Sequence, residues 1–201
     1  MNGPSVVVFD MGGVLYDFQG ARLIASSSRR PRRFRSEEVQ ALWAPISRGF
    51  ETGLESEADF ALAVVQAFDL SLTPSEFLSE FQRAAVGFYE GALSLVAELR
   101  ERHHVLSLSN TNPVQWQKLL NDLGASDPFH AHHPSHVSGF HKPDTRAFAA
   151  ISSGLSAHSE CHFFDDRTEN VEAARKFGWR AQRVRGVAEA RAACREASLL
   201  P

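Results

Sequence analysis

One stretch near the N-terminus decides the fold: Ser5-Val6-Val7-Val8-Phe9-Asp10-Met11-Gly12-Gly13-Val14-Leu15. Its four consecutive apolar residues, 6–9, are typical of a strand buried on both faces inside a parallel sheet. The strand ends in a carboxylate, Asp10, and two glycines then allow the backbone to turn tightly. Because ligands of open parallel sheets bind beyond the carboxyl ends of the strands, Asp10 is a candidate functional residue. Taken alone, it could equally be a turn residue that accepts hydrogen bonds from backbone N–H groups.

The composition bounds the class of protein. The 201 residues suffice for one domain, or for a domain with a large insertion, and 43% hydrophobic and 22% charged residues are ordinary for a soluble globular protein. A net charge of −3 argues against nucleic-acid binding, and no segment approaches membrane-spanning length. Cys161 and Cys194 form neither a disulfide framework nor a metal-site spacing. We therefore expect a cytoplasmic protein, monomer or homodimer, that binds neither nucleic acid nor membranes.

Later segments alternate between strands and helices, which predicts a parallel α/β sheet with right-handed crossovers. Asn112-Pro113 caps one expected helix, and Pro143 is expected at the start of another. The strand that begins at Cys161 ends in two carboxylates. The remaining expected strands cover 105–108 and 181–184, and the remaining helices cover 91–102, 114–123, 168–177 and 187–197.

Residues 18–90 have helical periodicity and predict a small helical bundle inserted after the first strand and a short flap, 14–18. The expected division is therefore a core of 1–17 and 91–201 with a helical cap of 18–90. Thr73-Pro74-Ser75-Glu76 has the pattern of a capped helix start, and the helix after it is expected to bury Phe77, Phe81 and Phe88. Pro45 is expected to kink the helix from Ser36 or to end its first half.

Two clusters of titratable residues are weaker signals. For the arginines, a solvated loop is the preferred interpretation, and a patch for anionic substrates or partners is the alternative. For the histidines, the spacing matches no standard zinc or nickel site, so we favour a histidine-rich loop without metal. The arginines are Arg29, Arg30, Arg32, Arg33 and Arg35, and the histidines are His130, His132, His133, His136 and His141, which precedes Lys142.

Polar residues follow three of the expected strands. Carboxylates that converge at one sheet edge repel one another unless a cation lies among them, and oxygen ligands without His or Cys favour Mg²⁺. A lysine, a hydroxyl and helix N-terminal amides opposite the metal would form a phosphate cradle, and Asp10 could attack phosphorus from there. The residues are Asp10, Ser109, Asn110, Asp165 and Asp166, with Lys142 close to a helix start.

Four ordered motifs resemble those of the haloacid dehalogenase (HAD) superfamily, and the helical insertion lies where members with a C1 cap carry theirs. The motifs are Phe9-Asp10-Met11-Gly12-Gly13-Val14-Leu15, Leu108-Ser109-Asn110-Thr111-Asn112, His141-Lys142-Pro143-Asp144 and Phe164-Asp165-Asp166 through Asn170. The chain is most similar in look to the sugar-phosphatase-like members, with which it also shares the weaker segment Gly49-Phe50-Glu51-Thr52-Gly53. The resemblance implies a Rossmann-like core and a Mg²⁺-dependent phosphatase of a small phosphorylated metabolite.

The resemblance also implies roles for single residues. Asp10 would be the nucleophile and a metal ligand, with the backbone carbonyl of Gly12 as a second ligand, Asp166 as a third, and Asp165 in or just outside the ligand shell. The phosphoryl oxygens would be held by Ser109, Asn110 and Lys142, and Lys142 would also screen Asp10 from the incoming dianion. Asn170 would support the acidic loop.

One position departs from the pattern of these phosphatases. Most carry a second Asp two residues after the nucleophile as general acid and base, but this chain has Gly12 there. Such help is worth about 10²–10⁴ in rate, so we expect a preference for acidic leaving groups, as in anomeric sugar, aryl or acyl phosphates. An aspartyl-phosphate without its base could also accumulate and pass to another acceptor. Tyr16, Asp17 or a cap residue could replace the missing acid, and the sequence does not select among them.

Three other functions stay open. A dehalogenase would use Asp10 to attack carbon, but such enzymes usually lack paired acids like Asp165 and Asp166 because they need no metal. A phosphotransferase or mutase would share the phosphorylated intermediate. A catalytically silent regulatory binding protein is suggested by the missing acid and opposed by the intact Asp10, Lys142 and acidic pair.

Overall fold

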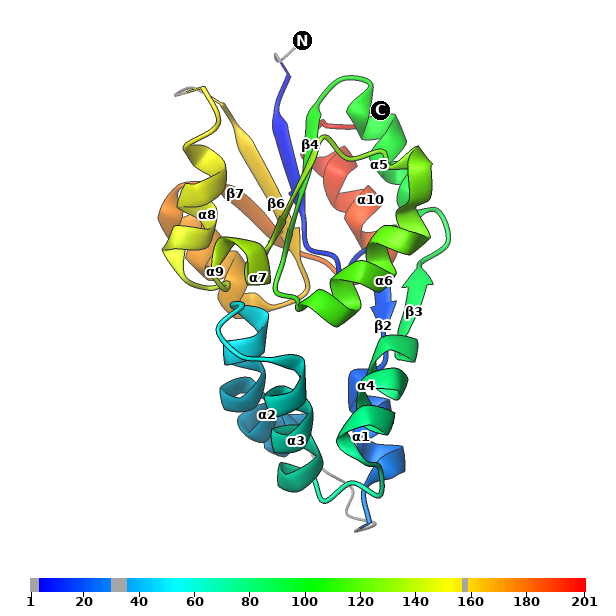
Figure 1. Cartoon of the computed structure of the whole chain (residues 1–201). Coiled ribbons are helices and arrows are strands. Elements are labelled where there is room, and N and C mark those ends of the chain that lie inside the picture. The colour runs from blue at the N-terminus through cyan, green and yellow to red at the C-terminus, as the bar shows by residue number, and fades with distance from the viewer. Residues whose placement is uncertain (1–3, 30–35, 157–158) are drawn as a thin grey trace.

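The computed structural model describes residues 4–29, 36–156 and 159–201 (Figure 1). Within these residues, the strands of the main sheet are β1 (Val6–Phe9), β4 (His104–Ser109), β5 (Ala131–Pro134), β6 (Cys161–Asp165) and β7 (Arg180–Arg183). They lie in the order β5-β4-β1-β6-β7, and all neighbours are parallel. The predicted parallel α/β sheet is confirmed. The strand that carries Asp10 lies at its centre, paired on both sides.

Helices cover both faces of this sheet because successive strand side chains point to opposite sides. Val7 and Phe9 pack with one set of helices, and Val6 and Val8 pack with the other. The first set is α5 (Ala92–Arg100), α6 (Pro113–Leu123) and α10 (Gly186–Glu196). The second set is α8 (Thr145–Ser152) and α9 (Thr168–Phe177). A short 3₁₀ helix, Gly124–Ser126, follows α6, and α7 (Ser135–Ser138) follows β5.

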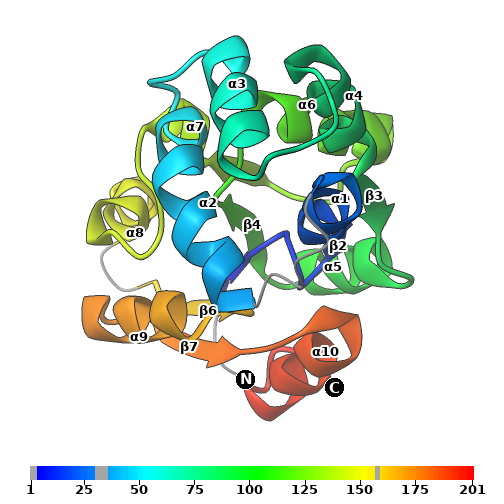
Figure 2. The ribbon, with the colours of Figure 1, turned by 90° about the horizontal axis from the view of Figure 1, so that it is seen from below.

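A helical insertion lies beyond the carboxyl ends of the strands, between the two strands of an antiparallel ribbon, β2 (Tyr16–Phe18) and β3 (Ala85–Phe88) (Figures 1 and 2). Its helices are α1 (Gly20–Ser27), α2 (Ser36–Glu51), α3 (Glu57–Ala67) and α4 (Pro74–Arg83). Their apolar faces form a hydrophobic cluster of their own, centred on Phe60. Thr73 forms the predicted capping box with Glu76 at the start of α4. In the following sections these four helices are called the cap.

Two local predictions are wrong, and a third is wrong in one of its two alternatives. Phe88 does not continue the helix of Phe77 and Phe81, because the chain after α4 pairs with β2 and places Phe88 against Tyr16. Pro143 does not begin a helix: Asp144 is the N-cap of α8, and its side chain accepts from the backbone N–H of Arg146. Pro45 does not end the first half of its helix, since α2 continues through it to Glu51, and the alternative that it kinks the helix stays a prediction. The expected flap 14–18 contains strand β2.

None of the helices in the described residues combines the length and the apolar character that a membrane span requires.

Candidate active site

Three carboxylates meet at the carboxyl edge of the sheet, as the order of the strands predicts. Asp10 follows β1 directly, Asp165 is the last residue of the neighbouring strand β6, and Asp166 follows it. One oxygen atom from each of the three side chains lies within 4.8 Å of the others. In the part of the chain that the structure describes, this is the only group of three or more acidic, histidine or cysteine side chains close enough to bind a metal ion together.

Lys142 lies beneath this cluster with only 1% of its side chain exposed. Its Nζ donates to Asp165 Oδ2 at 2.7 Å and to the Leu108 carbonyl at 2.7 Å, and it lies 2.9 Å from Asp10 Oδ1. Burial alone would lower the pKa of Lys142, but the charges of Asp10 and Asp165 outweigh burial and raise it. Lys142 is therefore a buried ammonium ion and not a surface charge.

The charges of the cluster are unbalanced in the absence of a metal. Burial raises the pKa of Asp10 to about 7; Lys142 opposes this shift, whereas Asp165 and Asp166 reinforce it. Burial, followed by the charge of Asp165, also raises the pKa of Asp166. One lysine does not compensate three converging carboxylates, so the site favours a bound proton or a cation.

Both carboxylate oxygens of Asp165 accept hydrogen bonds from other residues of the chain. Both of its carboxylate oxygens accept from the side-chain amide of Asn170 at 3.0 Å, and Oδ1 also accepts from the backbone N–H of Arg167 at 2.8 Å. With Lys142 on Oδ2, all of these donors come from the chain itself. The predicted support of the acidic loop by Asn170 is present in the structure.

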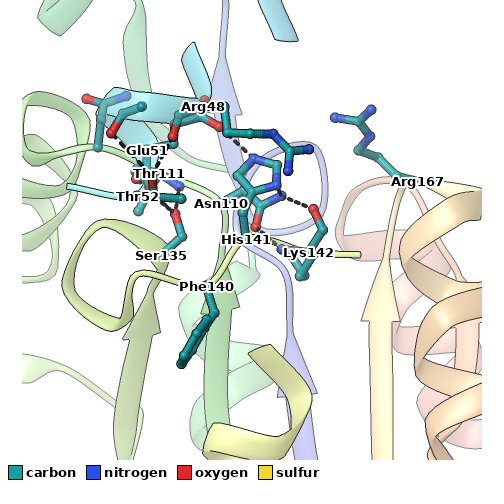
Figure 3. Close-up of polar contacts among 12 residues, drawn as sticks. Arg48, Glu51, Thr52, Asn110, Thr111, Ser135, Phe140, His141, Lys142 and Arg167 are labelled. Carbon is teal, nitrogen blue, oxygen red and sulfur yellow. Dashed lines mark hydrogen bonds and ion pairs between the residues drawn. The ribbon is translucent and has the colours of Figure 1, made fainter. Parts of the chain in front are cut away.

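Asn110 connects the end of β4 to the segment that carries Lys142. Its Oδ1 accepts from the backbone N–H of Lys142 at 2.8 Å, and its Nδ2 donates to the Lys142 carbonyl at 2.8 Å (Figure 3). The predicted neighbour, Ser109, is the last residue of β4 and is buried. Asn110 lines the cavity described next, whereas Ser109 is not among its lining residues in the described chain.

A cavity of about 390 Å³ opens above Asp10 and Lys142. Asp166 and Gly12 line it from the sheet edge, so this cavity gives access to the carboxylate cluster. Its remaining walls come from the C-terminal half of α2, from His141 and Pro143, and from the start of α9. The wall residues that sequence analysis did not assign to the site are Trp43, Ala44, Ser47, Arg48, Arg167 and Glu169.

Glu51, the last residue of α2, lies on this wall and contacts the core. Its Oε2 lies 2.7 Å from His141 Nε2, and its backbone carbonyl accepts from the Ser135 hydroxyl at 2.6 Å (Figure 3). His141 Nδ1 in turn lies 3.0 Å from Asn110 Nδ2. A cap residue is thus linked through two hydrogen bonds to the residue that holds Lys142. The sequence indicates the segment Gly49-Phe50-Glu51-Thr52-Gly53 as a weak family motif, but it does not predict the contact between Glu51 and His141.

Comparison with protein families decides what kind of protein this geometry belongs to. A family described as haloacid dehalogenase-like hydrolase matches residues 4–178, which include β1, the cap, Lys142 and the acidic pair. The chain belongs to the haloacid dehalogenase-like hydrolase family. The resemblance of the four motifs is thereby confirmed, and the catalytic class of this family member is hydrolase.

Individual relatives agree with the assignment to this family. The chain is 29% identical over 189 residues to Phosphatase MT3486 of Mycobacterium tuberculosis, covering 90% of this chain and 87% of that one. It is similar in fold to HAD-family enzyme bt-2542 of Bacteroides thetaiotaomicron, in a complex with magnesium and inorganic phosphate (TM-score 0.70, 21% identity, 90% and 94% of the two chains). It is also similar to L-2-haloacid dehalogenase from Xanthobacter autotrophicus (TM-score 0.63, 24% identity, 90% and 77%). The structural likenesses establish a shared HAD fold.

Of the described residues in the histidine and arginine clusters, only His141 lines the cavity above Asp10 and Lys142. His132 lies between the Ser107 hydroxyl and the Asp127 carboxylate, both at 2.7 Å, and the described histidines form no group that could bind a metal. Arg29 pairs with Asp69 at 3.7 Å. The other four arginines of that cluster lie outside the described residues.

Proposed function

We propose that this protein is a Mg²⁺-dependent phosphatase that hydrolyses the phosphate ester of a small metabolite through an aspartyl-phosphate on Asp10. The observation that carries the proposal is the buried Lys142, which lies 2.9 Å from Asp10 and 2.7 Å from Asp165 at the floor of the cavity. A buried cation at this place offers an electrostatic site for a phosphoryl group next to a carboxylate nucleophile. The phosphatase from M. tuberculosis and the magnesium and phosphate complex of the B. thetaiotaomicron enzyme support it.

The carboxylate cluster fits a hard cation, because its donors are oxygens and their charge exceeds that of Lys142. We assign Asp10, Asp166 and the Gly12 backbone carbonyl as Mg²⁺ ligands. Asp165 is placed just outside this ligand set, since Lys142 and Asn170 already occupy its oxygens, and its role is to hold Lys142. Bound Mg²⁺ neutralises negative charge on the phosphoryl group and on the carboxylates.

The chain's own residues supply the remaining steps. Lys142 and Asn110 line the cavity and are assigned, together with Ser109, to the phosphoryl oxygens. Asp10 attacks phosphorus, the bond to the leaving oxygen breaks, and water then attacks phosphorus and releases phosphate and Asp10. Lys142 reduces the repulsion between the Asp10 carboxylate and the dianionic substrate.

The cavity of about 390 Å³ suits a small substrate. Gly12 itself offers no side chain for proton transfer to the leaving group, and esters with acidic leaving groups depend least on such a transfer. Sugar phosphates esterified at the anomeric carbon belong to this group and are the first class to test.

A phosphotransferase is the second candidate, because the same intermediate could pass its phosphoryl group to another hydroxyl. An added sugar would then become phosphorylated while less inorganic phosphate is released. A dehalogenase is disfavoured by the acidic pair, and activity that disappears with EDTA would exclude it. A silent binding protein would show no turnover, and Asp10→Asn would change nothing.

The test is a phosphatase screen over sugar phosphates, nucleotides and an aryl phosphate, with Mg²⁺ and with EDTA. Wild-type protein should release phosphate only with Mg²⁺, and Asp10→Asn should abolish the release while retaining the fold. Lack of turnover on every ester, or full activity of Asp10→Asn, would overturn the proposed function.

A further inference from the structure

We propose that Glu51 of the cap is the general acid and base of the reaction, in place of the side chain that Gly12 lacks. This inference rests on the proposed function, because it concerns the protons that phosphate-ester hydrolysis must move. Two are required: the leaving oxygen must gain one, and the attacking water must lose one.

The site around Gly12 is open. A Cβ atom built on Gly12 meets no heavy atom within 4 Å, and Gly12 itself lines the cavity. The nearby flap does not supply the missing group. The Tyr16 hydroxyl donates to Asp122 at 2.6 Å, Asp17 accepts from Gln19 at 2.9 Å, and neither residue is among those that line the cavity.

The acidic side chains that line the cavity leave one candidate. Asp10 and Asp166 belong to the carboxylate cluster. Glu169 is paired with Arg167, whose Nε donates to it at 2.7 Å. Glu51 is the remaining carboxylate on the cavity wall in the described part of the chain, and it enters from the cap, facing the space that a substrate would occupy.

The hydrogen bonds around His141 determine which atom can move a proton. Because Asn110 Oδ1 accepts from the Lys142 N–H, Asn110 Nδ2 is a donor, and His141 Nδ1 accepts from it. The neutral imidazole therefore carries its hydrogen on Nε2 and donates it to Glu51 Oε2 at 2.7 Å. His141 has no free lone pair left and acts as a positioning residue. Glu51 Oε1 makes no hydrogen bond to the described residues and is the oxygen that exchanges protons.

One oxygen atom, Glu51 Oε1, donates the first proton of the reaction and accepts the second. In the first step Asp10 forms a bond to phosphorus, the bond from phosphorus to the leaving oxygen breaks, and that oxygen takes the proton from Glu51 Oε1. In the second step Glu51 takes a proton from water as the water oxygen attacks phosphorus and the Asp10 carboxylate leaves. Glu51 is protonated again at the end, and the hydrogen bond from His141 to Oε2 persists in both states.

The experiment compares Glu51→Gln with wild type on an alkyl phosphate and on p-nitrophenyl phosphate. Glutamine retains an oxygen that can accept from His141 but cannot carry the proton. We expect kcat for the alkyl ester to fall about 100-fold or more, and kcat for the aryl ester to fall by less, since its leaving group needs no acid. His141→Gln should change the ratio of the two rates in the same direction. Glu57→Gln, an exposed cap substitution at the start of α3, is the matched control and should behave as wild type.

Restoration of the missing acid separates catalysis from a structural role. Gly12→Asp has space for its side chain, and combined with Glu51→Gln it should recover at least about tenfold of the lost alkyl-ester activity. If Glu51 only tethers the cap, Glu51→Gln will lower both rates equally or raise both KM values, and Gly12→Asp will not rescue it; either result overturns the inference. Circular dichroism and bound Mg²⁺ verify the fold of each variant. A wild type without turnover would instead overturn the proposed function.

Discussion

Lys142 Nζ contacts the carboxylates of Asp10 and Asp165 at 2.9 and 2.7 Å, with 1% of the lysine side chain exposed. These contacts join the centre of the sheet to the segment before α8, because one ammonium group binds carboxylates at the ends of both β1 and β6. Removal of one partner of a buried ion pair leaves the other charges without compensation, and this costs more than the loss of an exposed pair.

Lys142→Met should therefore destabilise the metal-free protein by about 3–5 kcal/mol and abolish phosphatase activity. Urea unfolding in EDTA measures the first effect. Lys118→Met is the control, because Lys118 forms a partly exposed ion pair with Asp122, four residues further along α6, and its loss should cost at most about 0.5 kcal/mol. Equal stabilities of the two variants would contradict the compensation of the carboxylates by Lys142.

Mg²⁺ binding should depend on pH through Asp10. Without metal, burial raises the pKa of Asp10 from 3.8 to about 7, so the folded protein binds this proton more tightly than the unfolded chain does. The stability that this proton contributes is present below about pH 4 and is lost as the pH rises through about 7. Since Mg²⁺ must displace the proton, its apparent Kd should rise as the pH falls below 7, by up to about tenfold per unit. Titration calorimetry between pH 5.5 and 7.5 tests this, and a flat profile would refute it.

Arg48 should attract the substrate. Arg48 is exposed and lines the cavity, and its charge also contributes to the lowered pKa of Asp144. Arg48→Ala should raise KM for a dianionic ester about two- to fivefold with little change in kcat, because an exposed charge is worth at most about 1 kcal/mol. The effect should shrink in high salt. Arg83→Ala, on α4 and paired with Glu80, is the control; an equal KM change in both variants would count against a local role of Arg48.

The aromatic cluster of the cap should be required for activity but not for the metal site. Phe60 is fully buried, with ring centroids 4.5 Å from Phe50 and 5.5 Å from Phe81. Phe60→Ala should destabilise the protein by about 3–5 kcal/mol, whereas Leu62→Ala, at a side chain that is 46% exposed, should cost far less. At a temperature where the variant stays folded, kcat/KM should fall while Mg²⁺ binding persists. If Phe60→Ala lost Mg²⁺ binding but kept its kcat/KM, the expectation that the aromatic cluster supports activity and not the metal site would be wrong.

Most of the candidate site at the carboxyl edge of the sheet could be predicted from the sequence, because the evidence for it lies in short stretches of the chain. Runs of apolar residues predict the buried strands, and a parallel sheet brings Asp10, Ser109 and Asp165 to one edge. The cap wall could not be predicted in this way. Trp43 and Arg48 reach the cavity only because α2 crosses the edge of the sheet, which depends on packing between segments far apart in the chain. The prediction for Phe88 is wrong for the same reason: its spacing from Phe81 fits a helix, and only the pairing with strand β2 overrides that pattern.

The central place of β1 in the sheet affects how much conformational entropy is lost in each catalytic cycle. Asp10 follows a strand that is anchored on both sides, and its own backbone N–H donates to the Phe164 carbonyl at 2.8 Å. The backbone of this residue therefore loses its conformational entropy once, when the chain folds, and not again in each catalytic cycle. Each new substrate molecule then meets an attacking group whose orientation is already set, and only the ligand has to lose freedom on the way to reaction.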